Sequence, residues 1–263
     1  MSEIKLSFHL ICQDEESIIG QHIRFLLKLA SCVKYPVEFI IVDGGSKDST
    51  LKIIDKLKDD RFKIYNNPWP GFAAQRNFAK SKSSGEWTFM IDTDVTTSDN
   101  AYTRLNEVLD VGPDVIAYSL PKIHLATDIE HMYNKGLDPM VALFRNIPEI
   151  SWKGDGLEAP HFKDQLIHQH PHHFNFKWQK YIPDIVMIHF AELKSFEDKI
   201  QKCLKYSKTK GNFWFGRDET QIRNLVKEQE AKVNIAYGNK DDSDMICLIS
   251  ERFDDLKFYS EVG

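Results

Sequence analysis

The 263-residue sequence lacks several features that would assign it to a specialised class of protein. No stretch approaches the roughly 18 apolar residues that a membrane-spanning helix needs, so we expect no transmembrane segment. The N-terminal residues MSEIKLSFHLIC contain no basic region followed by a long apolar one, and a signal peptide is not expected. The four scattered cysteines match no zinc or redox motif and suit a reducing compartment. These absences predict a cytoplasmic protein.

The chain also lacks an excess of positive charge, because its formal net charge is −5. This excludes a uniform basic field that would attract nucleic acid or anionic lipid, although a local basic patch is still possible. The hydrophobic content of 42% and the aromatic content of 12% are sufficient for a folded core. The length predicts one large domain, or a domain with an extension.

Apolar strands alternate with amphipathic helices through the first half of the chain. This alternation predicts an α/β fold, a Rossmann-like and mostly parallel sheet flanked by helices. Beyond about residue 125 the pattern loosens, and an acidic tail begins at Asn239. We expect a large domain at 1–190 and a C-terminal helical extension at 191–263. Strands are predicted at 4–12, 37–43, 61–67, 86–92, 114–120 and 182–190, and helices at 17–32, 51–59, 71–85, 99–110 and 192–210.

Three aspartates lie where predicted strands end. Asp43 closes VEFIIVD, while Asp92 and Asp94 close EWTFMIDTD. Ligands of such sheets bind outside the carboxyl ends of the strands, and residues i and i+2 of an extended chain point to the same side. Two adjacent carboxylates repel each other, so a Mn²⁺ or Mg²⁺ ion held through oxygen would neutralise them and could bridge nucleotide phosphates. An acidic turn that caps the next helix accounts for the same residues.

Several of these motifs together resemble the family 2 glycosyltransferases of the GT-A fold, most closely the lipopolysaccharide-core glucosyltransferase type. IIVDGGSKDST is similar to the strand-end aspartate and turn of that family, and GFAAQRNFAKSKSSGEWTFMIDTD is similar to its Gln-basic-Asn helix and D-x-D strand. ALFRNIPEISWKGDGLE is similar to the segment that carries its acceptor-site acid. DIVMIHFAELKSFEDKIQKCLKYS is similar to its late histidine segment. The resemblance extends from about Leu6 to Ser207.

The resemblance implies a site for a nucleotide-sugar donor, by default a UDP-sugar, with a Mn²⁺ or Mg²⁺ ion. Asp43 would bind the base or ribose, and Asp92 would approach the ribose or a metal-bound water. Asp94 would ligate the metal, and His189 would supply a further metal or diphosphate contact. Without the resemblance, a buried core histidine is the simpler interpretation of His189. The other residues expected near the donor are Glu15, Gln75, Arg76 and Asn77.

A transferase also needs a base that deprotonates the acceptor hydroxyl. The motif match points to Glu158 in GDGLEAPHF, with Asp155 as the second choice. One base without an enzyme nucleophile implies inversion at the anomeric carbon. The sequence departs from the family at three points: Asp14 and Glu15 replace an Asn-Glu pair, Val95 follows the D-x-D instead of an acid, and Leu157 precedes Glu158 instead of histidine.

The sequence alone does not identify the acceptor. The resemblance favours a surface glycan or glycolipid. The segment Lys199–Arg217 carries basic residues, four aromatic residues and no acid. It is either a solvated helix face with a core-anchoring loop, or a patch for an anionic acceptor such as a phosphorylated glycolipid or DNA with hydroxymethylated bases. A non-catalytic nucleotide-binding module is a further alternative. The spacing of the histidines in HQHPHH at 168–173 matches no compact metal site, and the segment is predicted as a loop.

Overall fold

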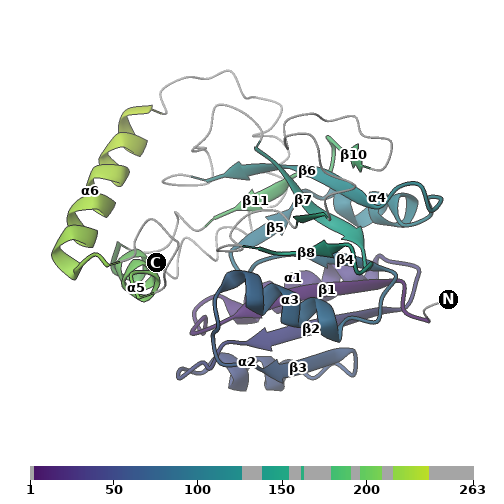
Figure 1. Ribbon diagram of the computed structural model, residues 1–263, viewed down its shortest axis with the longest axis horizontal. Helices are drawn as coiled ribbons and strands as arrows, with labels where there is room; N and C mark the ends of the chain where they lie inside the picture. Colours follow the sequence, from purple (N-terminus) through teal and green to yellow (C-terminus); the bar gives the residue numbers. More distant parts are fainter. Residues whose placement is uncertain are drawn as a thin grey trace. The chain divides into compact units, whose positions relative to one another are not determined.

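A computed structural model of the chain describes residues 3–125, 138–153, 161–162, 179–190, 196–208 and 216–236 (Figure 1). The chain divides into two compact units. The first comprises Met1–Pro121 and Pro139–Val186, and the second comprises Lys122–Asp138 and Met187–Gly263. No helix within the described ranges is both long enough and apolar enough to cross a membrane.

The first unit is built on a mostly parallel sheet with the strand order β3-β2-β1-β4-β7-β6. β1 pairs in parallel with β2 and β4, and β2 pairs in parallel with β3, whereas β7 runs antiparallel to β4. This confirms the predicted α/β fold. The strands are β1 (Leu6–Cys12), β2 (Val37–Asp43), β3 (Phe62–Asn66), β4 (Trp87–Met90), β6 (Ala117–His124) and β7 (Asp138–Arg145).

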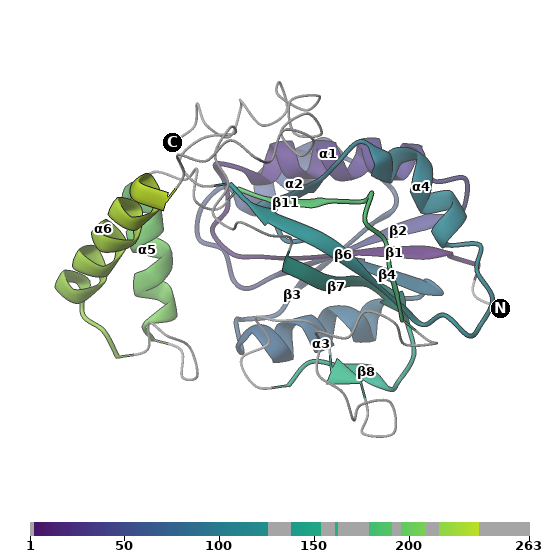
Figure 2. The ribbon, with the colours of Figure 1, turned by 90° about the horizontal axis from the view of Figure 1, so that it is seen from above.

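Helices cover both faces of this sheet. Seen from above, α1 and α4 lie on one face and α3 lies on the other (Figure 2). Every residue of β1 and β2 is buried, as expected for parallel strands that are covered on both sides. The helices are α1 (Ile19–Ser31), α2 (Thr50–Leu57), α3 (Phe72–Lys82) and α4 (Asn100–Val108). The short strands are β5 (Val95–Thr97), β8 (Ile150–Ser151), β9 (His161–Phe162) and β10 (Gln179–Tyr181). β8 pairs with β9, and β10 pairs with β6.

Three phenylalanines fix the register of the central strands. Phe8 pairs with Phe39 on β2 and with Phe89 on β4. The ring centroids of Phe8 and Phe39 are 5.2 Å apart, and those of Phe8 and Phe89 are 6.1 Å apart. All three side chains are buried, so a slip of either strand by one residue would move a ring to the opposite face of the sheet and break this stack. The same register brings the carboxyl ends of β1, β2 and β4 to one edge of the sheet.

A buried carboxylate ties the opposite end of the sheet together. Glu38, near the start of β2, is 2% exposed. Its Oε1 accepts hydrogen bonds from Ser7 Oγ at 2.6 Å and from the Ser84 amide at 2.6 Å, and its Oε2 accepts from Lys63 Nζ at 2.6 Å and from Ser84 Oγ at 2.9 Å. The side chain therefore joins β1, β2, β3 and the loop that precedes β4.

The end of α3 differs from the prediction. We expected Gly85 to end the helix, but α3 ends at Lys82 with Ser83 as its C-cap. Gly85 has a packing role instead, because a Cβ at this position would lie 2.6 Å from Ser7 Oγ and 2.7 Å from the Ser7 amide. Glycine is required here so that the loop can approach β1 closely.

Among its described residues, the second unit contains one strand pair and two helices. Lys122–His124, the end of β6, pairs in parallel with β11 (Met187–His189). α5 (Phe196–Tyr206) lies within the helix predicted at 192–210. α6 (Glu219–Ala236) lies within the helical extension expected at 191–263, but it was not predicted as a separate helix. Its sequence signal is a capping box, in which the Gln221 amide donates to Asp218 Oδ1 at 2.9 Å and the Asp218 amide donates to Gln221 Oε1 at 3.0 Å. The two helices share a small core of Ile200, Cys203, Ile222 and Val226.

Candidate functional site

The loops that follow β1 and β2 are joined by hydrogen bonds. The Asp14 amide donates to Ser46 Oγ at 2.9 Å, and the Lys47 amide donates to Asp14 Oδ1 at 2.7 Å. The Glu15 amide donates to Thr50 Oγ1 at 2.8 Å. Asp14 adopts a left-handed backbone with φ of 55°, which aspartate tolerates better than most residues. These contacts form a continuous rim along the carboxyl edge of the sheet and place Glu15 on it.

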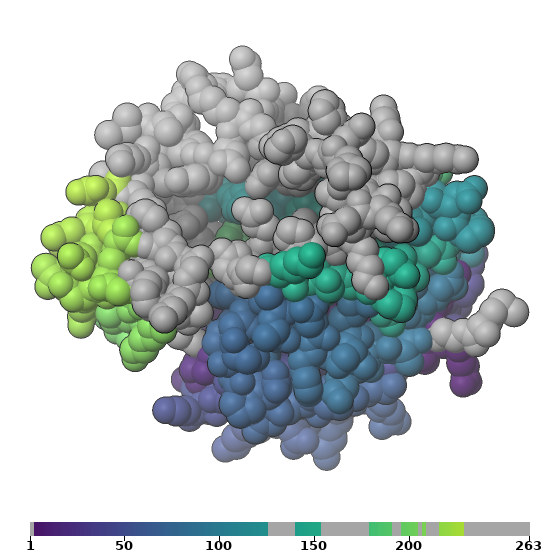
Figure 3. All heavy atoms as spheres, viewed as in Figure 1, coloured from purple at the N-terminus to yellow at the C-terminus, as the bar shows by residue number. Residues whose placement is uncertain are grey.

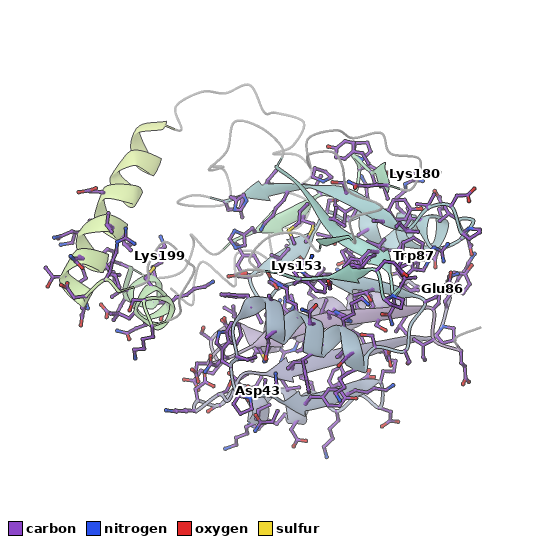
Figure 4. All side chains as sticks on the ribbon, viewed as in Figure 1. Asp43, Glu86, Trp87, Lys153, Lys180 and Lys199 are labelled. Atoms are coloured by element: carbon purple, nitrogen blue, oxygen red, sulfur yellow. The ribbon has the colours of Figure 1, made fainter. Side chains whose placement is uncertain are left out.

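Asp43 builds the turn at the end of β2. Its buried carboxylate accepts hydrogen bonds from the Gly45 amide at 2.9 Å, from the Ser46 amide at 3.0 Å and from the Ser46 hydroxyl. Gly45 has φ of +93°, which favours glycine. Asp43 lies at the carboxyl edge of the sheet, where the sequence predicts it (Figure 4). Its carboxylate already organises the turn, and its contact with a base or ribose stays a prediction.

Gln75 connects α3 to the same edge. Its Oε1 accepts from Asn67 Nδ2 at 2.7 Å, and its Nε2 donates to the Asn67 carbonyl at 3.1 Å. The Asn67 amide in turn donates to the Asp43 carbonyl at 2.9 Å. Gln75 is fully buried, so it holds the loop after β3 against the end of β2. Its predicted place near the donor stays a prediction.

Arg76 and Asp92 form a bidentate ion pair. Arg76 Nη1 and Nη2 donate to Asp92 Oδ1 and Oδ2, each at 3.0 Å. The Arg76 side chain is 4% exposed and that of Asp92 is 31% exposed. A planar guanidinium suits a carboxylate in this geometry better than lysine would. Arg76 thus supplies part of the neutralisation that the sequence reasoning assigned to a divalent cation.

Asp94 follows in the turn between β4 and β5. It is 5% exposed, and Val95 begins β5 directly after it. Among the described residues, no group of three or more histidine, cysteine, aspartate or glutamate side chains is arranged to hold a metal ion. The described side chains by themselves therefore do not form a complete metal site. The carboxylates at this edge still suit Mg²⁺ or Mn²⁺, because these ions bind through one or two carboxylates together with substrate phosphates.

His22 is a residue near the carboxylate pair that the sequence reasoning missed. It is fully buried in α1, and in the part of the chain that the structure describes neither ring nitrogen has a hydrogen-bond partner. Burial lowers the pKa of His22 to about 4, although Asp94 and Asp92 act in the opposite direction. The ring is therefore neutral at pH 7. The only sequence signal is a polar residue on the apolar face of a predicted helix.

His189 lies in the second unit, at the end of β11. Its Nδ1 is 2.8 Å from Nδ1 of His124, the residue that it faces on β6. At this distance one Nδ1 donates a hydrogen bond to the other, so one of the two nitrogens carries a hydrogen and the other accepts. His124 was not predicted as a site residue. The proposed metal or diphosphate contact of His189 is not tested by this pairing.

The remaining predicted residues are Asn77, the proposed acids with the histidine segment, and the basic segment. The Asn77 side chain contacts the backbone of Trp152. Glu158, Asp155 and the 168–173 histidine segment lie outside the described residues, so their predicted roles stay predictions. Of the basic segment Lys199–Arg217, Lys199 lies on α5 (Figure 4). Lys199 and Lys202 are partly buried, and Lys208 is exposed.

The curated relatives point to the same family as the motifs. A lipopolysaccharide core biosynthesis glycosyltransferase, LpsC of Rhizobium meliloti (strain 1021), is 30% identical over 122 residues, which cover 46% of this chain and 43% of LpsC. A dolichyl-phosphate beta-glucosyltransferase of Dictyostelium discoideum is 29% identical over 101 residues, which cover 35% of this chain and 30% of that protein. The chain thus spans less than half of the length of these relatives.

A solved structure supports the fold, and a family model identifies the family. TarS of S. aureus, residues 1–349 in complex with UDP-GlcNAc, aligns with a TM-score of 0.50 at 13% identity, covering 89% of this chain and 73% of that one. The fold matches the GT-A fold of glycosyltransferases, as the motifs predict. The model for "Glycosyl transferase family 2" matches residues 7–175. The chain belongs to glycosyl transferase family 2.

Proposed function

We propose that the chain is a metal-dependent, inverting glycosyltransferase that moves a sugar from a nucleotide-sugar, by default a UDP-sugar, to an acceptor hydroxyl. The observation that carries the proposal is the common edge of the sheet that holds Asp43, Asp92 and Asp94, with Arg76 already paired to Asp92. Family membership supports the reaction class. Sugar transfer from a panel of nucleotide-sugars, measured with Mn²⁺ present and absent, tests it.

The donor would bind along the rim of joined loops. Asp43 would receive the base or ribose, because the turn that its carboxylate organises holds it at the carboxyl edge of the sheet. Asp94 would hold the metal ion, and His189 would add a contact to the metal or the diphosphate. When bound, a divalent cation stabilises the charge of the departing diphosphate. The Arg76–Asp92 ion pair would keep the second carboxylate in a fixed orientation beside Asp94.

We expect the metal ion and the nucleotide to bind cooperatively. A single carboxylate supplies few ligands, so most of the coordination would come from the diphosphate. Mn²⁺ should therefore bind weakly to the protein alone, and UDP should tighten its binding by about tenfold or more, with a reciprocal effect of Mn²⁺ on UDP. Calorimetric titration of each ligand with and without the other measures both effects. Equally tight Mn²⁺ binding without UDP would contradict a site completed by the donor.

Glu158 is proposed as the general base, with Asp155 as the alternative. Replacing Glu158 with glutamine should leave UDP affinity within about twofold and lower kcat by about 10² or more, because the acceptor hydroxyl loses its proton acceptor. Steady-state transfer assays and UDP titrations separate the two effects. Asp155→Asn is the matched control. A large loss in this variant and none in Glu158→Gln would transfer the role to Asp155.

The acceptor is proposed to be a sugar of a surface glycan or a glycolipid. The support is the similarity to LpsC, which is named for lipopolysaccharide core biosynthesis. A hydroxymethylated DNA base would instead need a cationic surface and a salt-dependent interaction. Electrophoretic mobility titrations with duplex DNA at low salt discriminate between the two classes, since a neutral glycan acceptor predicts no DNA binding.

A further inference from the structure

The loop between β3 and α3 is held against the residues that follow β2. The Asn67 amide donates to the Asp43 carbonyl at 2.9 Å, and the Trp69 amide donates to the Gly44 carbonyl at 3.1 Å. The Gly44 amide in turn donates to the carbonyl of Cys12, the last residue of β1, at 2.8 Å. These backbone hydrogen bonds fix Trp69 at the carboxyl edge of the sheet, beside the turn that Asp43 builds.

The indole ring of Trp69 lies directly against Gly44. A Cβ at Gly44 would be 2.8 Å from Trp69 Cε3 and 3.2 Å from Gln13 Cβ, and the first of these distances is too short for a carbon–carbon contact. Gly44, unlike Gly45, does not have a left-handed backbone, so the turn itself does not require glycine at this position. The missing side chain of Gly44 therefore leaves the room that the ring occupies.

The ring is supported from α3 and from the core. The ring centroids of Trp69 and Phe72 are 4.8 Å apart at an interplanar angle of 88°, an edge-to-face arrangement. Both rings pack on a cluster of buried residues formed by Ile11, Ile40, Val42 and Ala79. Both also remain partly exposed, and α3, which begins at Phe72, lies in open view on the surface (blue atoms in Figure 3). Trp69 is thus a well-supported aromatic side chain with part of its surface accessible at the ligand-binding edge.

The carboxylate beside this ring offers a ligand little surface of its own. Asp43 is 1% exposed, and its oxygens already accept hydrogen bonds from the Gly45 and Ser46 amides. One further hydrogen bond from a nucleobase would leave the faces of the base in water. Aromatic side chains bind bases by stacking, and the gain in affinity is large and depends little on which base is present. A partly exposed indole next to the same turn would supply this contact.

We infer that Trp69 is the side chain on which the nucleobase of the donor stacks, with Asp43 beside it. The inference rests on the proposed function, because it describes one half of the proposed nucleotide-sugar site. It assigns the base and the diphosphate to different groups of the protein. Trp69 sets the affinity for the base, whereas Asp94 and the metal ion set the affinity for the diphosphate. The two affinities can therefore be changed separately.

Substitutions of Trp69 test the stacking by calorimetric titration. Trp69→Leu removes the aromatic face and should weaken UDP binding by about 10-fold to 10²-fold, while Trp69→Phe should retain UDP affinity within about threefold. Pyrophosphate has no base, so its affinity in the presence of Mn²⁺ should stay within about twofold in both variants. Loss of both affinities together would indicate a structural defect and overturn the inference, as would unchanged UDP affinity in Trp69→Leu.

A neighbouring aromatic residue is the matched control. Phe78 is also partly buried and packs on the same core cluster, but it lies on α3 with its ring next to Tyr65 at a centroid distance of 6.1 Å. Phe78→Leu removes a ring of the same cluster without removing the one beside Gly44. Its UDP affinity should stay within about twofold of the wild type. An equal loss of UDP affinity in Phe78→Leu and Trp69→Leu would overturn the inference.

Gly44 gives a second test that leaves Trp69 in place. A methyl group at Gly44 would displace the indole ring, so Gly44→Ala should weaken UDP binding by about fivefold or more and leave pyrophosphate affinity unchanged. Gly112→Ala is the control, since a Cβ there would meet no atom of the described residues within 4 Å. In the Trp69→Leu background, Gly44→Ala should have less than about a twofold further effect, because both changes act on one contact. Full multiplication of the two losses would overturn the inference.

Tryptophan fluorescence reports the contact itself. A base stacked on Trp69 should change its emission, so UDP should change the fluorescence of the wild type and pyrophosphate should not. Trp69→Phe should lose this change while it still binds UDP, and an equal change in that variant would overturn the inference. If the wild type binds no nucleotide, the proposed function fails. If the wild type and Trp69→Leu bind UDP equally well, only the inference fails.

Discussion

Replacement of Asp94 with asparagine is expected to lower kcat by about 10³-fold and to remove the Mn²⁺-dependent part of UDP affinity. Asp94 is 5% exposed, and the amide has nearly the same shape as the carboxylate, so the fold should be retained. What is lost is the negative charge that would hold a divalent cation against the diphosphate. Electrostatic stabilisation of a leaving group is worth a rate factor of this size. Transfer assays and UDP titrations with and without Mn²⁺ measure both losses.

Two further aspartates show whether the effect belongs to Asp94. Asp55 lies exposed on α2, and Asp55→Asn should change neither quantity. Asp92→Asn should mainly lower stability, because Arg76 is buried and would lose its carboxylate partner. Full activity of Asp94→Asn in the presence of a chelator would rule out the metal assignment.

Replacement of Glu38 with glutamine is expected to lower the free energy of unfolding by about 2 to 4 kcal/mol. The carboxylate is 2% exposed and accepts hydrogen bonds from Ser7, Lys63 and Ser84. Glutamine turns one of the two acceptor oxygens into a donor, which would face the Lys63 ammonium or the Ser84 groups. Urea unfolding of both proteins measures the difference. UDP affinity should not change, because Glu38 lies near the opposite end of β2 from Asp43, about 16 Å away along the strand.

The same carboxylate predicts a pH dependence of stability. Burial by itself raises the pKa of Glu38, but hydrogen bonds from Lys63, Ser7 and Ser84 outweigh it and lower the pKa from 4.5 to about 2. A pKa that is lower in the folded than in the unfolded state stabilises the fold above the unfolded value. This contribution should be complete above about pH 4.5 and should disappear as the pH falls toward 2.

Two variants control this prediction. In Glu38→Gln the stability should fall less steeply between pH 4.5 and 2 than in the wild type. Lys63→Met should cost less than Glu38→Gln, because the exposed Lys63 ammonium is screened by water and Glu38 keeps its hydrogen bonds from Ser7 and Ser84. Identical pH profiles for the wild type and Glu38→Gln would show that another group governs the acid transition.

Much of the site could be located from local pattern. Val37–Asp43 is a nearly continuous apolar run that ends in a carboxylate, and such a run predicts both a buried parallel strand and its carboxyl end. The same reasoning placed Asp92 and Asp94 beyond β4. Several elements escaped it, among them the short strands β5, β8, β9 and β10 as well as β7 and α6. β7 contains a proline and pairs antiparallel between strands of a mostly parallel sheet, and α6 has only two strongly buried apolar positions in its described part.

The amino-acid sequence by itself determined approximately where β1, β2 and β4 end, and therefore which acidic residues reach the ligand-binding edge, because apolar runs and helical periodicity are properties of neighbouring residues. The sequence did not determine which groups these acidic residues and the neighbouring polar side chains contact. Arg76 holds Asp92, Asn77 holds Trp152, and His124 meets His189 across two strands. Each of these contacts joins segments distant in sequence. A buried polar group must find a partner when water is excluded, and which partner is within reach depends on how the helices and strands pack.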